Sequence, residues 1–567
     1  MKFMNGHALV MNPSGPTPRI YSLLGEVIKQ PDDDGEETDE RDADGCDVCD
    51  EYDDELFFCQ ACKWKFCGGC WRAQAVHKPK RKASQPAEHV KIPLSVVRLV
   101  QPAFSNPPDD KSLEKWLAAE EDAAWFGVGK SVKDSPLYFH DYGRYSGLMA
   151  ATNAYLKSHE RTSSVYEEIY DDFPFPNPRA PSLVSFVGQT GAGKSTLIKL
   201  LIQIKDSAEG LNFHRPVAGL PGKDVPTSED VHLYLDPGSS LSTNPILYAD
   251  CEGIDGGARE PMATTFRHKR DESETEGDNR ETVSNQISSK RELHWAKSPL
   301  ERTRQFVVAK FYPRLLFTFS DVVIFVHRNP RTIESVLEKL IEWATDALEA
   351  SYNHPILPYA VIVLNSTPAN IQQSLWDVDV ATEALLDSLS KTLNRNVVFA
   401  EYAKSWKARG RILENVEDLM MCYYSSVRVV HLPVDTEPKL VLDQAQKLYT
   451  EITFGCKVAR ERKSELRMLL DEDSLQHYLQ HAFDHYSRTL EIPFDFVQAS
   501  FLFNPIPANF GGSILKLAIA LKDQQKTPDA RAIFERLSRL VASCILLDAA
   551  RHRILGTSNR RPIAAEV

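Results

Sequence analysis

The sequence of 567 residues has no long apolar run. No stretch approaches the roughly 18 uninterrupted apolar residues that span a bilayer, and the start lacks a basic segment followed by an apolar one. We therefore expect no transmembrane segment, no secretion and a cytoplasmic location. With 42% hydrophobic and 26% charged residues, the composition is that of a globular chain. Its length suits about three or four domains of about 150 residues.

Basic residues are scarce in one segment. Residues 31–56 hold 15 Asp and Glu against one Arg, whereas the rest of the chain has 65 basic and 64 acidic residues. Such a block is typical of a solvated tail. The alternative is a segment that binds a basic partner electrostatically. Residues 1–40 show no periodicity and are predicted to be a disordered acidic tail. This charge argues against nucleic-acid binding.

The middle of the chain alternates short apolar runs with helical patterns, which predicts an α/β fold with a mainly parallel sheet and helices on both faces. Residues 255–292 contain almost no aliphatic side chains and are expected to be a flexible insertion. Residues 93–100 suggest a strand, and residues 113–126 and 145–158 have helical spacing. The predicted strands after residue 178 are 182–188, 231–235, 245–250, 321–327, 359–365 and 427–433. The predicted domains are 41–92, a cysteine-rich zinc finger; 93–178, mixed and mainly helical; 179–435, the α/β domain; and 436–567, helical.

A glycine-rich octapeptide runs from Gly188 to Ser195 between a predicted strand and a predicted helix. It matches G-x-x-x-x-G-K-[ST], the P-loop of nucleoside triphosphatases (NTPases), whose glycines let backbone N–H groups surround phosphate oxygens. Lys194 would supply a charge to the β and γ phosphates, and Ser195 a hydroxyl to Mg²⁺. The alternative is a turn that merely joins strand to helix. The expected nucleotide contacts are Gly188, Thr190, Gly191, Ala192, Gly193, Lys194, Ser195 and Thr196.

Two further segments fit an Mg²⁺-nucleotide site. Asp250 ends a predicted strand, where a carboxylate would hold Mg²⁺ through water, and Gly253 follows at the spacing Asp-x-x-Gly to sense the γ phosphate. Thr227 precedes another strand and is a candidate switch residue for Mg²⁺ and catalysis. Its alternative is an ordinary turn or capping hydroxyl.

These motifs together resemble the G domain of large GTPases. The loop is similar to that of dynamins in carrying Gln189 after the first glycine, and Asp250-Cys-Glu-Gly253 is similar to a motif of the guanylate-binding protein and atlastin group. The resemblance covers residues 179–435 and implies GTP binding. Asn365 would contact the base, but the Asp that recognises guanine in the family is missing, so ATP stays open.

The resemblance also implies slow hydrolysis, or hydrolysis stimulated by self-association into a homo-oligomer. Ile254 stands where small GTPases have a water-orienting Gln, so Gln189 is the candidate for that role by similarity to dynamins. Arg259 is a candidate stabiliser of transition-state charge.

Cysteine is concentrated in one segment, with six of the ten residues between positions 46 and 70. Cys-x-x-Cys pairs clip Zn²⁺ from tight turns, and alternate pairs interleave in a cross-brace. The spacing resembles the B-box zinc finger more than RING. One predicted ion is held by Cys46, Cys49, Cys67 and Cys70, and the other by Cys59, Cys62, His77 and His89. Both would be structural, in a module that binds an unidentified protein partner.

One basic cluster and one histidine pattern indicate a function less clearly than the motifs above. Lys78, Lys80, Arg81 and Lys82 fit a nuclear address or, better, a solvated linker. The histidines at 477, 481 and 485 fit a metal or pH-sensitive stripe, but packing is the better interpretation.

Three functions remain. The leading hypothesis is a GTPase-like switch or self-assembling large GTPase. Its competitors are a non-enzymatic nucleotide-binding scaffold that acts through its zinc finger, and an ATP-using P-loop NTPase. A ubiquitin ligase is disfavoured because no RING pattern is present.

Overall fold

The structure is a computed structural model of the chain. It describes residues 45–50, 55–77, 89–105, 110–130, 136–160, 179–206, 213–217, 230–253, 289–328, 333–348, 351–352, 356–466, 468–492, 494–503, 510–523 and individual positions from 529 to 546. Within these ranges, no helix combines the length and the apolar character that crossing a membrane requires.

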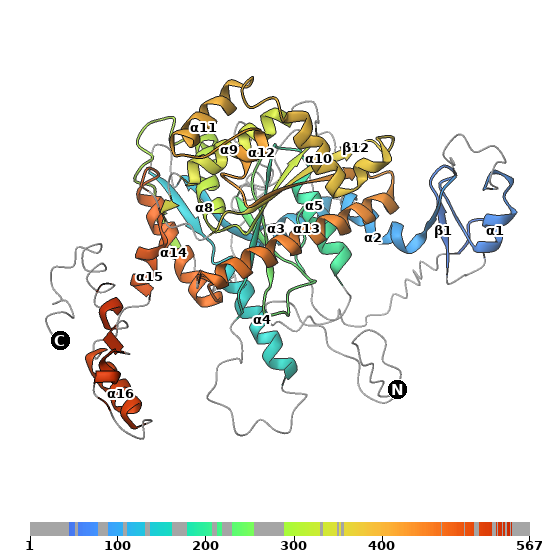
Figure 1. Cartoon of the computed structure of the whole chain (residues 1–567). Coiled ribbons are helices and arrows are strands. Elements are labelled where there is room, and N and C mark those ends of the chain that lie inside the picture. Colours follow the sequence, from blue (N-terminus) through green and yellow to red (C-terminus); the bar gives the residue numbers. More distant parts are fainter. Residues whose placement is uncertain are drawn as a thin grey trace.

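The cysteine-rich segment forms a small module beside the main body (Figure 1). Its sheet has the antiparallel order β2-β1-β3. A buried cluster of Phe57, Phe66 and Trp71 lies under this sheet, with Phe66 and Trp71 packed edge to face. The elements of this Cys/His module, residues 45–93, are β1 (Phe57–Cys59), β2 (Trp64–Phe66), α1 (Gly68–Ala73), η1 (Ala75–His77) and β3 (Lys91–Pro93).

The described part of the main body contains a nine-stranded mixed sheet in the order β13-β12-β10-β6-β8-β7-β4-β5-β9. The five strands from β13 to β8 are parallel, and each later pair is antiparallel. All seven residues of β6 are buried, as expected for a strand covered on both faces. The strands are β4 (Ala124–Lys130), β5 (Leu137–Asp141), β6 (Ser182–Gly188), β7 (Val231–Leu235), β8 (Ile246–Asp250), β9 (Ser289–Glu292), β10 (Val322–His327), β12 (Tyr359–Thr367) and β13 (Ser426–Pro433).

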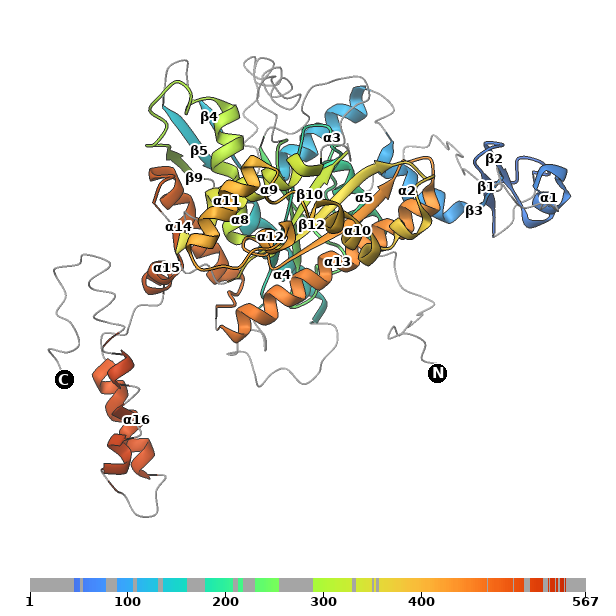
Figure 2. The ribbon, with the colours of Figure 1, turned by 45° about the horizontal axis from the view of Figure 1, so that its top comes forward.

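Helices pack on the parallel part of the sheet (Figures 1 and 2). α5 (Lys194–Lys205) and the long α13 (Pro438–Glu465) contact each other and the sheet, and α8 (Tyr312–Phe319) and α9 (Ile333–Leu348) form a second packed pair. The other helices are α2 (Leu94–Phe104), α3 (Asp110–Asp122), α4 (Arg144–Glu160), α7 (Arg304–Phe306), η3 (Val307–Phe311), η5 (Gln373–Trp376), α10 (Val378–Leu389), α11 (Val397–Ala408), α12 (Val416–Met420), α14 (Glu472–Arg488), α15 (Phe496–Phe503) and α16 (Phe510–Asp523). Two short strands, β11 (Ser351–Tyr352) and β14 (Phe494–Asp495), pair separately.

The mixed α/β architecture agrees with the expectation from sequence, and the six strands predicted after residue 178 are present as β6, β7, β8, β10, β12 and β13. The strand expected at 93–100 is wrong, because this segment lies in α2. Leu94, Val97 and Val100 recur every three residues and are buried along one helical stripe. The insertion expected at 255–292 is too long, since its last four residues form β9, which pairs with β5. Residues 254–288 lie outside the described residues.

Strands from both sides of the predicted boundary at residue 178 share one sheet. β4 pairs with β7, which lies beyond the boundary, and β5 pairs with both β4 and β9. Phe126 and Phe139 on these strands are completely buried in the core that also contains Val184 and Phe186 of β6. The segment 93–178 therefore contributes to the core of the α/β unit.

α2 joins the Cys/His module to the main body. Its first half places Leu94 and Val97 in the apolar cluster of the module, together with Cys46 and Cys67. Its second half places Val100 and Ala103 in a cluster with Leu200 of α5 and Val441 of α13. One continuous helix thus belongs to two small cores.

Gly455 lies where α13 packs tightly against β12 and β10 of the sheet. A Cβ atom added there would lie 2.9 Å from Tyr359 and Val322. We predict that Gly455→Val destabilises the protein by about 1–3 kcal/mol, because a larger side chain overpacks this contact. Thermal or urea unfolding followed by circular dichroism measures the effect. Gly511→Val in α16 is the control, since its Cβ would meet nothing within 4 Å. Equal stability of the two variants would contradict the packing described for α13.

Candidate functional site

The predicted glycine loop, residues 188–195, connects the carboxyl end of β6 to the start of α5. Gly188 has a φ of 145°, and a Cβ atom there would lie 2.3 Å from the Val326 carbonyl oxygen. Gly193 has a φ of 97°, and its Cβ would lie 2.3 Å from Asn365 Nδ2. Both positions therefore require glycine. The buried Leu197, Ile198 and other apolar residues of α5 anchor the helix that follows.

Lys194 is buried inside this loop. Its Nζ donates to the carbonyl oxygens of Gly188 and Gln189 at 3.3 and 3.1 Å. Burial lowers the pKa of its ammonium group, while the negative charges of Asp250 and Glu252 act in the opposite direction. The loop therefore surrounds a cation with neutral carbonyl partners.

Asp250 and Ser195 face each other across the loop. Ser195 Oγ donates to Asp250 Oδ2 at 2.6 Å, and Asp250 is 1% exposed at the end of β8. Burial raises the pKa of Asp250 to about 6, although Lys194 and Ser195 lower it. Its other oxygen, Oδ1, is buried without a hydrogen-bond partner among the described residues. A carboxylate oxygen of this kind beside a serine hydroxyl is the donor set that a hard divalent cation prefers.

Gly253 and Asn365 also reach the loop. A Cβ atom on Gly253 would lie 2.3 Å from Thr190 N, so its backbone lies directly against the loop. Asn365 Nδ2 donates to the Ala192 carbonyl oxygen at 2.7 Å, and its Oδ1 accepts from Ser366 N at 2.8 Å. The residues predicted from three separate segments are thus brought together at the carboxyl ends of β6, β8 and β12.

Sequence analysis missed two arginines near this edge. Arg328, which follows β10, donates to the Gly191 carbonyl oxygen and to Ser366 Oγ, each at 3.2 Å. Arg304 forms a bidentate ion pair with the buried Glu252, with Nη2 to Oε2 at 2.7 Å. Arg328 has a detectable signal, because it directly follows an apolar run whose carboxyl end must lie at the same sheet edge. Arg304 lies in a polar segment with no such signal.

Several predicted residues are not described by the structure. Thr227, Ile254 and Arg259 lie outside the described residues. His232 of β7 pairs with Asp250 of β8, so the chain enters β7 beside Asp250. Gln189 is described and is exposed at the start of the loop.

The eight predicted metal ligands come together as the two predicted sets. In each set the four ligand atoms lie within 4.8 Å of one another. The Sγ atoms of Cys49 and Cys67 are 3.9 Å apart, and Cys62 Sγ lies 3.4 Å from His77 Nε2 and 3.3 Å from His89 Nδ1. Tetrahedral Zn²⁺ with bonds of about 2.0–2.3 Å has ligand atoms about 3.5–3.8 Å apart. Both sets could therefore hold a metal ion.

The local backbone repeats in the two sets. Asp50 N donates to the Cys46 carbonyl oxygen and Lys63 N to the Cys59 carbonyl oxygen, and Asp50 and Lys63 both have φ near 60°. The first Cys-x-x-Cys pair of each set is therefore closed by the same turn, while Cys67 and Cys70 lie at the start of α1. Burial raises the pKa of the Cys46 thiol, but hydrogen bonds from backbone N–H groups, with Cys67 foremost, lower it to about 7. Thiolates at this position are thus easily formed.

His77 is oriented from outside its set. Its Nδ1 lies 3.3 Å from the Trp71 carbonyl oxygen, and its ring stacks on Trp71 with centroids 3.9 Å apart. A ligating histidine whose second nitrogen bonds a backbone carbonyl has a fixed tautomer and a fixed ring direction. The ring of His77 is therefore already oriented as a metal ligand.

Two of the three histidines of the stripe on α14, His481 and His485, pack against neighbouring residues, whereas His477 is exposed. His485 Nε2 donates to the Ile492 carbonyl oxygen at 2.8 Å, and the rings of His481 and His485 each lie 5.7 Å from Phe494. Burial lowers the pKa of both rings. None of these histidines belongs to a metal-ligand group in the described part of the chain. The basic cluster at 78–82 lies outside the described residues.

We predict that the purified protein contains two zinc ions per chain. His89→Ala should lower the content to about one, because it removes one ligand from the second set, and metal analysis of the dialysed protein measures this. Cys544→Ala is the control and should keep both ions, since Cys544 lies outside both sets. A chain without zinc, or a loss of metal in the control, would contradict the assignment.

Comparison with known proteins assigns the chain to no family. No family model matches the chain, and no curated protein matches it.

Proposed function

We propose that the glycine loop binds the phosphates of a nucleoside triphosphate with Mg²⁺, and that the protein is a slow GTPase-like switch. One observation carries the proposal: a buried ammonium, a serine hydroxyl and a buried carboxylate oxygen without a partner converge at the start of one helix. Backbone amides at a helix start and a lysine suit phosphate oxygens. The hydroxyl of Ser195 and the carboxylate of Asp250 suit Mg²⁺.

The arrangement of the sheet supports this proposal. β6 lies between β8 and β10 and is parallel to both, so the carboxyl ends of three strands meet at the glycine loop. In open α/β sheets, ligands bind at this edge. β7 is antiparallel to β8, so β7 begins at the same edge, and Thr227 precedes its first residue, Val231, by four positions in the sequence. Thr227 is therefore retained as the candidate switch residue.

The base is proposed to be guanine, with adenine as the alternative. Asn365 lies against the loop, where a base would follow the phosphates, and its amide group already bonds Ala192 and Ser366. It can brace the loop whichever purine is bound. No carboxylate replaces the Asp that the G-domain resemblance leads us to expect, so the proposal of GTP rests on that resemblance.

Hydrolysis is proposed to be slow and to be accelerated by self-association. Gln189 is exposed beside the loop and is the proposed water-orienting residue, while Lys194 stabilises charge on the phosphates. A non-enzymatic scaffold that binds nucleotide without turnover is the competing proposal. The two differ in phosphate release.

We predict that the protein binds GTP more tightly than ATP and only with Mg²⁺. Asp250→Asn and Lys194→Ala should each weaken binding at least about tenfold, because each removes a charged contact worth about 1.5–3 kcal/mol. Competition binding with fluorescent nucleotides measures this. Lys205→Ala, at the other end of α5, is the matched control.

Release of γ phosphate completes this test, with Lys194→Ala as the blank. Preference for ATP would overturn the GTP assignment and leave the phosphate site intact. Equal phosphate release by the wild type and Lys194→Ala would remove the enzymatic proposal, and equal nucleotide binding would remove the site itself.

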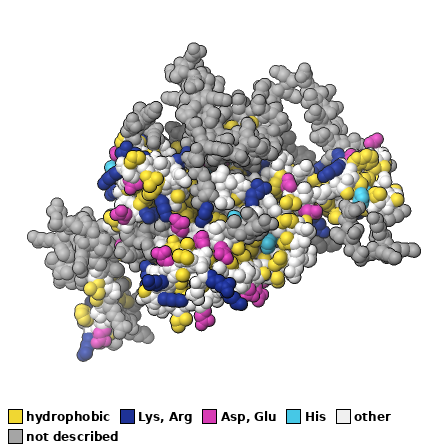
Figure 3. Space-filling view, turned by 90° about the horizontal axis from the view of Figure 1, so that it is seen from above, with side chains coloured by type: hydrophobic (Ala, Val, Ile, Leu, Met, Phe, Trp, Pro, Cys, Tyr) yellow, Lys and Arg dark blue, Asp and Glu magenta, His cyan; other side chains and the backbone are white. Residues whose placement is uncertain are grey.

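The Cys/His module is proposed to hold two structural zinc ions and to bind a protein partner. Large apolar side chains remain exposed on it, and hydrophobic atoms gather there in Figure 3. Trp64 is 51% exposed although it belongs to β2. Exposed aromatic residues are enriched at protein interfaces. The exposed set is Val48, Trp64, Val76 and Val90.

We predict that the Trp64→Ala variant keeps both zinc ions. Fewer proteins should cross-link to its Cys/His module in cells, because the substitution removes a central aromatic contact. Quantitative mass spectrometry of cross-linked material measures the loss. Phe454→Ala is the control, since Phe454 is 53% exposed on α13. Identical cross-linked proteins in all three samples would contradict an interface at Trp64.

A further inference from the structure

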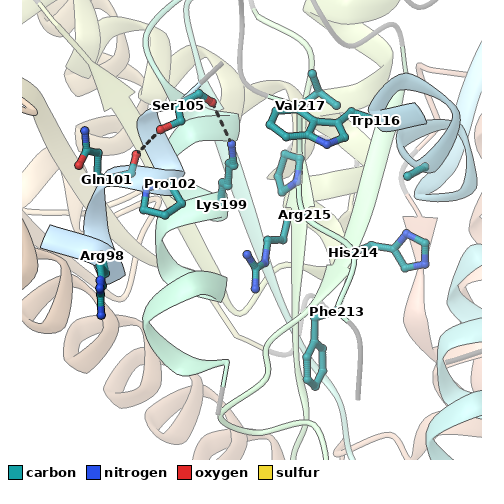
Figure 4. Close-up of a pocket in the computed structure, with 12 residues that line it drawn as sticks. Arg98, Gln101, Pro102, Ser105, Trp116, Lys199, Phe213, His214, Arg215 and Val217 are labelled. Atoms are coloured by element: carbon teal, nitrogen blue, oxygen red, sulfur yellow. Dashed lines mark hydrogen bonds between the residues drawn. The ribbon is translucent and has the colours of Figure 1, made fainter. Parts of the chain in front are cut away.

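A second cavity lies between the helix that carries the Cys/His module and the helix that follows the glycine loop. Its volume is about 820 Å³, and its walls come from α2, α3, α5 and residues 213–217 (Figure 4). Lys199 on its α5 wall is five residues beyond Lys194, about 7.5 Å further along the helix. The cavity is therefore separate from the glycine loop.

Lys199 is a buried cation that has no acidic partner among the residues that the structure describes. Lys199 is 6% exposed. Its Nζ donates to the Ser105 carbonyl oxygen at 3.4 Å, which is long for a hydrogen bond. The ammonium lies 4.8 Å from the Trp116 ring centroid. Within the described part of the chain, no carboxylate lies within 4 Å of it. Burial lowers the pKa of Lys199, as does the charge of Arg215, while Glu120 raises it.

The nearby acidic groups are already engaged. Asp206 pairs with Arg215, and Glu120 accepts from the backbone N–H of Val217. None of the described lining residues is acidic, whereas Arg98, Lys199 and Arg215 are cationic. In Figure 4, Lys199 extends toward Ser105, while His214 is turned away from it. The cavity therefore has a net positive lining.

Besides the polar Gln101, Ser105 and His214, the lining contains apolar side chains, two of them flat aromatic rings. Trp116, Phe213, Pro102 and Val217 line the same space. Binding cavities of 300–1,000 Å³ that combine apolar walls with a few charged groups are typical of small-molecule sites. A buried charge is costly to keep unpaired, and an incoming anion would relieve that cost.

We propose that this cavity binds a small organic anion, a carboxylate or phosphate attached to a flat apolar group. The anion pairs with Lys199 and Arg215, and the apolar group packs on Trp116 and Phe213. Because the cavity has walls from both α2 and α5, the bound anion links the Cys/His module to the helix of the glycine loop. The binding site itself does not depend on the proposed nucleotide function.

The test uses 1-naphthyl phosphate as the probe, titrated calorimetrically into the full chain. The wild type should bind it, and Lys199→Met should weaken binding at least about tenfold, the value of one charge-assisted hydrogen bond. Lys115→Met, adjacent to Trp116 but outside the cavity lining, is the matched control and should bind like the wild type. Lys194→Ala should retain binding, because it alters only the glycine loop. Neutral 1-naphthol should bind at least about tenfold more weakly.

Unfolding temperatures separate a ligand role from a structural one. Lys199→Met should melt at the same temperature as the wild type or higher, because it removes a buried charge that has no acidic partner. The proposal is overturned if the wild type gives no binding at millimolar probe or if Lys199→Met binds equally well. It is also overturned if 1-naphthol binds as tightly as the phosphate, or if Lys194→Ala abolishes binding. A lower melting temperature for Lys199→Met with unchanged binding would assign Lys199 to structure alone.

Discussion

The contact between Ser195 and the buried Asp250 is the constraint on which the candidate nucleotide site depends. It joins the glycine loop after β6 to the end of β8. The positive charge of Lys194 also interacts with the carboxylate of Asp250. A pKa raised from 3.8 to about 6 means that folding with this carboxylate ionised costs on the order of 3 kcal/mol. The cost applies above the folded pKa and disappears below the unfolded one, so it is present at neutral pH. A divalent cation on the free oxygen would remove it.

In the smaller Cys/His module too, the fold depends on residues that could bind a metal ion. The Cys/His module has few buried apolar side chains, and its ligands occupy part of the space that a core would fill. A metal ion bound there would supply folding free energy that hydrophobic burial does not. Because Cys46 and Cys67 share an apolar cluster with Leu94 and Val97, the order that such an ion imposes would extend into α2. The same helix ends against α5, so the module is attached to the α/β unit by packing and not by a free linker.

The sequence was sufficient where local pattern and tertiary environment agree. β6, β8 and β10 are continuous apolar runs because they are buried on both faces, and the glycine loop has its expected strand and helix at its two ends. The two metal-ligand sets followed from the spacing of six cysteines and two histidines. β4 escaped detection because Ala124, Trp125 and Phe126 continue the apolar spacing of α3, and β9 because Ser-Lys-Arg-Glu has no apolar alternation. α2 has β-branched valines typical of strands, but the two apolar clusters at its ends require a helical stripe, so tertiary packing overrides local propensity.

The second cavity could not have been inferred from any segment, since its cationic residues are spread from Arg98 to Arg215 and belong to no motif. Only the packing of α2 on α5 brings them together. This packing gives the cavity its significance, because α5 begins with Lys194 and Ser195 and also carries Lys199. The two proposed sites therefore draw on the same helix, one at its start and the other near its middle. If both sites are occupied, the free energy of coupling between them must be reciprocal, so an anion that changes nucleotide affinity is bound more or less tightly by the same factor when nucleotide is present.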